Sequence, residues 1–393
     1  MKTNGAFSWG ILLCKFKDHP EEPRSPDYFR QLLATHSSGG ISDYWSTMSY
    51  GALDMSGATL YGWVDMDTAA DADFMKLSRW DKTQKCVAAV VRTLGLTQFS
   101  RFATHDGLIC ITNASAGDGG RTGNRVLLDT GGWRHTFIAH ETGHVLGLDH
   151  TFDIKATPWD ATSDGRPGAY GDSRDIMSAE TFGGLQTVFD GRFGNTGPGL
   201  CALTRVQLGW LEPSRITEMN VVPGEDWNTQ GGVSAVDDPE ARGNPLFRIT
   251  ADGTVNGVPV DQIVYTIEFR PRIGWDAGLP ADAVTIRMMR DGDVARITWS
   301  GNGTQDWHPG ERFFDAVRKL AIDIVRIDDD KSAASVAFAA GTRAGVLRNF
   351  SVRKTLGPRY DLSLGLRAIR PRAPFRTDSV RSRLLDNPPQ FEA

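Results

Sequence analysis

Residues 140–150 read HETGHVLGLDH, and their spacing predicts a helix that ends in a sharp turn beside a metal site. Residues four apart share one face of an α-helix, so His140 and His144 can present their imidazoles to one ion. Gly147 can adopt backbone angles that other residues rarely adopt, which lets the chain end the helix and bring His150 back toward that ion. The three histidines are therefore the predicted metal ligands.

The ligand set predicts the chemistry. Three neutral imidazoles leave one position of a tetrahedral zinc ion open for water, as in catalytic zinc sites. Glu141 follows the first histidine, so it lies beside the ligand pair and within reach of that water. Zinc lowers the pKa of the water and polarises a carbonyl group, and Glu141 acts as general base. Among the 8 histidines of the chain, His135 is expected to be an ordinary packed or surface residue.

HETGHVLGLDH resembles the zinc signature of the metzincin metalloproteases, and this resemblance implies a methionine turn downstream. The chain supplies RDIMSAE, in which Met177 would lie under the zinc ion without binding it. The resemblance also implies that NRVLLD (124–129) is the edge strand that pairs with an extended peptide substrate. Residues 178–185 would then build the pocket for the substrate residue after the cleaved bond.

The chain departs from some relatives that share this signature. Astacins and serralysins carry a tyrosine ligand two residues after the methionine, but Ala179 stands here, so that ligand is expected to be missing. Tyr170 could assist the oxyanion, although a packing role is favoured. The loop at 160–175 is rich in aspartate, and Asp160, Asp164 or Asp172 could hold calcium. A solvated loop is favoured there, because the spacing fits no EF-hand.

Hydrophobic periodicity divides the chain into an α+β part and an all-β part. Residues 1–212 are expected to form a metzincin-like catalytic domain, a twisted mixed sheet with helices and a small lower subdomain. Strands are predicted at 11–16, 106–114 and 124–129, helices at 25–35, 39–51, 79–95 and 199–211, and a β-hairpin at 52–66. The overall layout, with a C-terminal β domain that carries a stretch such as YTIEFRPRIGWDAGLP (265–280), is similar to secreted bacterial proteases of the immune inhibitor A type and to gametolysin.

Six segments after residue 243 alternate with a period of two and predict a β-sandwich over 213–341. They are 246–250, 262–271, 283–289, 294–301, 319–327 and 334–340. Residues 342–393 carry 11 Lys or Arg against 4 Asp or Glu, and they are expected to form a basic, solvated extension.

Composition excludes several classes of protein. Apolar residues make up 40% of the chain and charged residues 23%, which is typical of globular domains rather than disordered ones. A net charge of -5 argues against a nucleic-acid partner. We expect no transmembrane segment and see no secretory signal, although the family resemblance implies an extracellular protein. The four cysteines fit two disulfides or four free thiols equally well, and the oligomeric state stays open.

The sequence therefore predicts a zinc-dependent endopeptidase that acts on proteins or peptides, with His140, His144 and His150 as ligands and Glu141 as base. Two alternatives remain. One is a binding protein that keeps the metal fold but is catalytically silent or has its cleft plugged. The other is a zinc hydrolase of a small amide.

Overall fold

The computed structural model describes residues 2–95, 104–155, 166–178, 184–241, 243–290 and 293–342. The protein is a mixed α/β structure with several sheets and few helices. The described residues up to Thr342 belong to one compact unit. Four subjects of prediction lie wholly or largely outside the described residues. They are Asp160 and Asp164, Ala179, the pocket segment 178–185 and the basic extension after Thr342.

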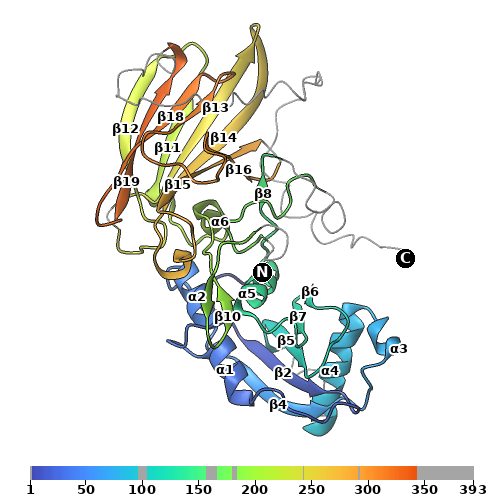
Figure 1. The fold of residues 1–393 in the computed structure, drawn as a ribbon. Helices are drawn as coiled ribbons and strands as arrows, with labels where there is room; N and C mark the ends of the chain where they lie inside the picture. Colours follow the sequence, from blue (N-terminus) through green and yellow to red (C-terminus); the bar gives the residue numbers. More distant parts are fainter. Residues whose placement is uncertain are drawn as a thin grey trace. The chain divides into compact units, whose positions relative to one another are not determined.

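The first sheet has five strands in the order β4-β2-β5-β7-β6 (Figure 1). Their bounds are Thr59–Asp65, Trp9–Lys15, Gly107–Thr112, Arg125–Leu128 and Gly120–Thr122. The first four strands run parallel, and β6 runs antiparallel to β7. The side chains of β5 and β7 are all buried, as expected for parallel strands that are covered on both faces.

Helices cover both faces of this sheet because successive strand residues point to opposite sides. Ile11 and Leu13 pack in one core cluster with helices on one face, whereas Leu12 and Cys14 pack in another with α4. The helices are α1 (Pro26–Ala34), α2 (Ile41–Met48), α3 (Ala72–Met75), α4 (Arg79–Thr93) and α5 (His135–Val145). The predicted cap of α1 is confirmed, since the Ser25 side chain accepts a hydrogen bond from the Tyr28 N–H.

Two predictions about this sheet are wrong. Residues 52–66 do not form a hairpin: β3 (Leu53–Asp54) pairs in parallel with β1 (Gly5–Ala6), and β4 pairs in parallel with β2. The helices between β2 and β4 carry the chain across one face of the sheet, which makes a parallel connection. NRVLLD, the segment of β7, is not the edge strand, because the glycine-rich segment before it folds back as β6 and covers its outer side.

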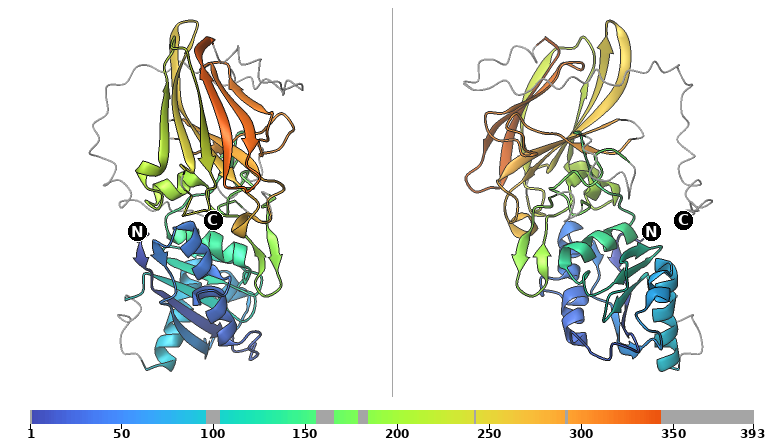
Figure 2. Two further views of the ribbon diagram at one scale, coloured as in Figure 1. Left: turned by 90° about the vertical axis from the view of Figure 1, so that its left-hand side faces the viewer. Right: turned by 45° about the vertical axis from the view of Figure 1, so that its right-hand side comes forward.

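The second half of the chain forms two sheets that share an apolar core (Figure 2). Across this core the rings of Phe247 and Phe338 lie 5.1 Å apart. The sheet orders are β11-β13-β14-β15-β16-β8 and β12-β19-β18-β17. The bounds are β8 Phe152–Asp153, β11 Ile216–Val221, β12 Trp227–Ser234, β13 Leu246–Val255, β14 Val258–Arg270, β15 Ala283–Arg290, β16 Arg296–Ile297, β17 Arg312–Asp315, β18 Leu320–Ile327 and β19 Ala333–Ala340.

All six predicted strands of this half are confirmed, although β16 is much shorter than its segment. Strands β11, β12 and β17 were not predicted. The predicted closing helix is α6 (Ala202–Gln207), and it follows a two-stranded sheet of β9 (Val188–Asp190) and β10 (Gly194–Thr196). Two single-turn helices lie at Pro213–Arg215 and Gly274–Asp276.

The two halves share a sheet. Strand β8 (Phe152–Asp153), which directly follows the histidine motif, pairs in parallel with β16 of the second half. The boundary that was predicted near Pro213 falls between the two large apolar clusters. Independent folding of the halves stays a prediction.

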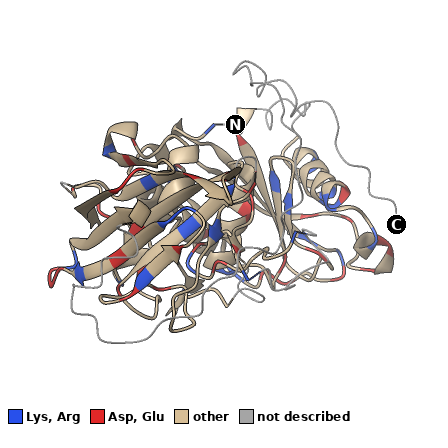
Figure 3. Ribbon diagram, turned by 90° about the horizontal axis from the view of Figure 1, so that it is seen from above, with Lys and Arg blue, Asp and Glu red and all other residues tan. Residues whose placement is uncertain are grey.

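Buried charges also join the halves. We call the group Asp172, Arg174, Glu268, Arg287 and Asp306 the buried charge layer; each member is at most 5% exposed. Arg174 donates two hydrogen bonds to the Asp306 carboxylate, at 2.9 and 2.6 Å. Arg287 donates to Asp172 at 2.7 Å and to Glu268 at 2.6 Å. Acidic and basic residues are intermixed in the view from above (Figure 3).

Arg174→Ala should lower the free energy of unfolding by ~3–5 kcal/mol, because it leaves the Asp306 carboxylate buried without its cation. The measurement is urea unfolding of the variant and the parent. The matched control is Arg248→Ala, which breaks an exposed pair with Glu218 and should cost under ~1 kcal/mol. Equal losses in the two variants would contradict the role of the buried charge layer.

Acid should remove the contribution of Glu268 to the free energy of unfolding. Burial raises its pKa, but Arg287 and Arg270 outweigh burial and hold the pKa at about 2. Stability from a depressed carboxyl pKa is present above the pKa of the unfolded chain, ~4.3, and is lost as pH falls toward the folded value.

The stability difference between the parent and Glu268→Gln should therefore shrink as pH falls from about 6 toward 3. Urea unfolding at each pH measures it. A difference that stays constant or grows over this range would show that Glu268 is not held ionised by its arginines.

Candidate metal centre and cleft

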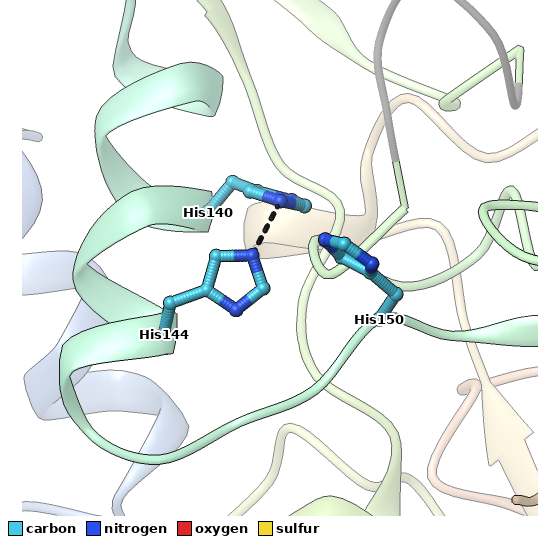
Figure 4. Close-up of side chains that lie close together, drawn as sticks. All are labelled: His140, His144 and His150. Atoms are coloured by element: carbon cyan, nitrogen blue, oxygen red, sulfur yellow. Dashed lines mark hydrogen bonds between the residues drawn. The ribbon is translucent and has the colours of Figure 1, made fainter. Parts of the chain in front are cut away.

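The three predicted ligands converge in the structure. Figure 4 shows His140 and His144 projecting from α5 and His150 from the chain that follows the helix, with their rings turned toward one another. One ligand atom from each lies within 4.8 Å of the others. Gly147 makes the turn at φ +95°, in the left-handed region that the sequence predicted.

Backbone carbonyls fix the orientation of the first two rings. His140 Nδ1 lies 3.0 Å from the Ile176 carbonyl and 3.1 Å from that of Ser178. His144 Nδ1 lies 2.8 Å from the Leu148 carbonyl. A carbonyl oxygen can only accept, so each Nδ1 carries the hydrogen and each Nε2 carries a lone pair. Metal-bound histidines are held by the same kind of bond.

The two Nε2 atoms face each other at 3.0 Å. Burial lowers the pKa of both His140 and His144 to about 4, so neither ring carries a second proton at neutral pH. Two lone pairs at this distance repel each other unless a cation lies between them. The separation is also within the ~4 Å that two nitrogens bound to one zinc ion can span. The residues fit a metal cation.

His150 completes the group beside Tyr170. Its ring centre is 4.7 Å from that of His144 and 4.1 Å from that of Tyr170. Tyr170 adopts φ +61°, a conformation that is uncommon outside glycine and that concentrates at functional sites. Tyr170 thus packs on a candidate ligand; a role at the oxyanion stays a prediction.

Met177 lies beneath the motif helix. A Cβ on Gly143 would come within 2.5 Å of the Met177 Sδ, so no larger residue fits at that position without a shift. The Met177 N–H donates to the Asp175 carboxylate, which also accepts from the Cys201 N–H. The sequence did not single out Gly143, although its place between His140 and His144 was a usable signal of close packing.

Glu141 contacts the edge of the first sheet. Its Oε2 accepts a 2.6 Å hydrogen bond from the N–H of Arg121 in β6. Burial raises the pKa of Glu141, while His144 and this hydrogen bond act in the opposite direction. Arg79, the first residue of α4, donates to the Arg121 carbonyl at 2.8 Å and twice to Asp118. The helix therefore holds the edge strand over the carboxylate.

A cleft of ≈ 680 Å³ exposes this arrangement. Its lining includes the three histidines, Glu141, Tyr170, Gly119, Arg121 and Arg79. The Glu141 carboxylate, the three converging histidines and the edge of β6 thus share one cleft. Groups of these types in one cleft are the ones that metal-assisted hydrolysis of an extended substrate requires.

The β half anchors the segment that contacts His140. Ser173 donates to the Gln305 side chain through both its N–H (3.1 Å) and its hydroxyl (2.9 Å). The segment 172–178, which supplies Met177 and two carbonyls to His140, is thereby tied to the second half. The sequence reading placed Asp172 in a solvated loop, whereas the structure buries it against Arg287. Its partner lies 115 residues away, so no local pattern could have revealed it.

His135, the motif's upstream neighbour, is packed in the core, one of the two environments that the sequence left open for it. Its ring stacks on Trp275 at 4.9 Å, and burial lowers its pKa to about 4. All four cysteines are buried free thiols, one of the two alternatives that the sequence left open.

No protein-family model matches the chain, and no curated protein matches it either. Within the described part of the chain, every helix is too short or too polar to cross a membrane.

Substitution of one ligand should remove metal binding. Parent protein titrated with Co²⁺ should bind one equivalent and show the visible absorption of a nitrogen-ligated ion, and His144→Ala should lose it. His36→Ala is the control, since His36 is half exposed and pairs with Asp54. Unchanged cobalt binding by His144→Ala, or an equal loss in the control, would contradict the site.

Proposed function

We propose that this protein is a zinc-dependent endopeptidase. The observation that carries the proposal is the shared cleft, in which Glu141 and three convergent histidines lie beside the edge strand β6. An exposed strand edge can bind an extended peptide through backbone hydrogen bonds. A carboxylate next to an open metal position supplies the base that hydrolysis needs.

His140 and His144 would hold the ion through their Nε2 atoms, and His150 would hold it through one of its ring nitrogens. When bound, zinc supplies a water of lowered pKa and polarises the scissile carbonyl. Glu141 would be the general base, which accepts a proton from the attacking water and returns it to the amine as the C–N bond breaks. The Arg121 N–H holds the carboxylate in place before substrate arrives.

Substrate pairing would involve β6 rather than β7. The N–H and C=O of Arg121 both point away from β7, because they contact Glu141 and Arg79. An incoming peptide strand would compete for these two groups. This assignment keeps the expected binding mode but moves it to the three-residue strand Gly120–Thr122.

The finer placement among metzincins is part of the same proposal. It is supported by the HETGHVLGLDH signature, the left-handed turn at Gly147, and Met177 packed under the motif helix. The extra tyrosine ligand of astacins and serralysins has no counterpart in this sequence, so three histidines would be the protein ligands.

Glu141→Gln should leave the protein folded and loaded with zinc while peptide cleavage falls by about 10²–10⁴-fold, because the amide keeps the bond to Arg121 but cannot accept the proton. Mass-spectrometric mapping of cleavage in a mixed peptide library, with bound zinc measured in parallel, tests this. Cleavage by the parent should also stop with a chelator and return with zinc. A variant that cleaves as fast as the parent would refute the mechanism.

One observation favours the alternative of a plugged or silent protein. The two outward groups of Arg121 are already engaged within the chain. A version of the protein that ends near residue 341 separates a plugged protein from a silent one. Removal of a plug formed by the C-terminal extension would start cleavage that the full chain lacks. For a small-amide hydrolase, in contrast, a proline that blocks β6 would leave turnover unchanged.

A further inference from the structure

Among the cationic side chains that line the cleft, only that of Arg121 forms no ion pair with a carboxylate of the described residues. Its side chain is exposed and makes one hydrogen bond, from Nε to the Gly123 carbonyl at 2.9 Å. Arg79, the neighbouring cation, is paired with Asp118 at 2.7 Å. The terminal nitrogens of Arg121 therefore stay available to a ligand.

The other charged side chains of the cleft already have an ion-pair partner or a proposed role. Asp149 pairs with Arg166 at 2.8 Å, and Glu141 is the proposed base. Arg121 is thus the group that sets the electrostatic preference of the cleft for a substrate side chain. Its guanidinium offers a planar fork that matches a carboxylate with two parallel hydrogen bonds.

Arg121 also lies next to the place where the bond is cut. Its own N–H is 2.6 Å from the Glu141 carboxylate. In an antiparallel pair, directly opposed residues have Cβ atoms ~4.5–5.5 Å apart. A peptide paired with β6 would therefore place one of its residues within reach of the Arg121 guanidinium, close to the scissile bond.

The surrounding glycines leave this arginine unobstructed. Residues 119, 120 and 123 are glycine, so Arg121 and Thr122 carry the only side chains of this part of the strand. Its single bond to Gly123 orients the guanidinium without neutralising it.

We propose that Arg121 makes the site select acidic peptides, with Asp or Glu within about two residues of the cleaved bond. The inference rests on the proposed peptidase function and adds its substrate class. A charge-assisted pair in a partly enclosed cleft is expected to change kcat/KM by about tenfold.

The test uses the full-length zinc-loaded protein and matched peptides that carry Glu, Gln or Lys at each position from three residues before to three residues after the cleaved bond. The parent should prefer Glu over Gln about tenfold at one of these positions, and salt should weaken that preference. Arg121→Gln should bring the Glu-to-Gln ratio of kcat/KM close to one. Arg121→Glu should reverse the preference toward Lys.

Arg290→Gln is the control, because Arg290 is an exposed arginine at the end of β15 in the second half; its ratio should match the parent's. Cleavage without an acidic preference, or a preference that survives in Arg121→Gln, overturns the inference and leaves the peptidase function intact. Zinc-loaded parent that cleaves no peptide overturns both.

Discussion

Charges that leave water must face a partner, and this constraint fixes how the two halves of the protein fit together. Arg174 and Arg287 are buried between segments from both halves, and each binds a buried carboxylate. A guanidinium left in the interior without its carboxylate would cost several kcal/mol. The segment 172–178 therefore has one well-defined position against the β half. The carbonyls that orient His140 come from this same segment.

The geometry of the candidate metal centre depends on that support. With Nδ1 of each ring bonded to a carbonyl, the Nε2 atoms of His140 and His144 direct lone pairs at one another, and a cation between them would relieve their repulsion. On the opposite side, Arg79 fixes the edge strand that holds Glu141. The histidines and Glu141 are thus held by two separate sets of contacts, one from the segment 172–178 that the β half anchors and one from α4 through β6.

Local patterns predicted the parts whose cause is local. The helix, the turn at Gly147 and the ligand face follow from the spacing within eleven residues, and alternating side chains revealed the strands of the β half. The errors came from long-range pairing. The segment 52–66, expected to form a hairpin, instead forms strands that pair in parallel, because pairing within the sheet and not the local turn determined their partners. NRVLLD is not the edge strand, because β6 pairs with its outer side. The partners of Asp172 and Arg174 were invisible for the same reason.

X-ray absorption at the zinc edge tests the central claim, a three-histidine site with an open position, most directly. Protein loaded with one equivalent of zinc should show four light-atom ligands at about 2.0–2.1 Å, with multiple scattering from three imidazoles and one further oxygen from water. A sulfur ligand near 2.3 Å, or fewer than three imidazoles, would contradict the account.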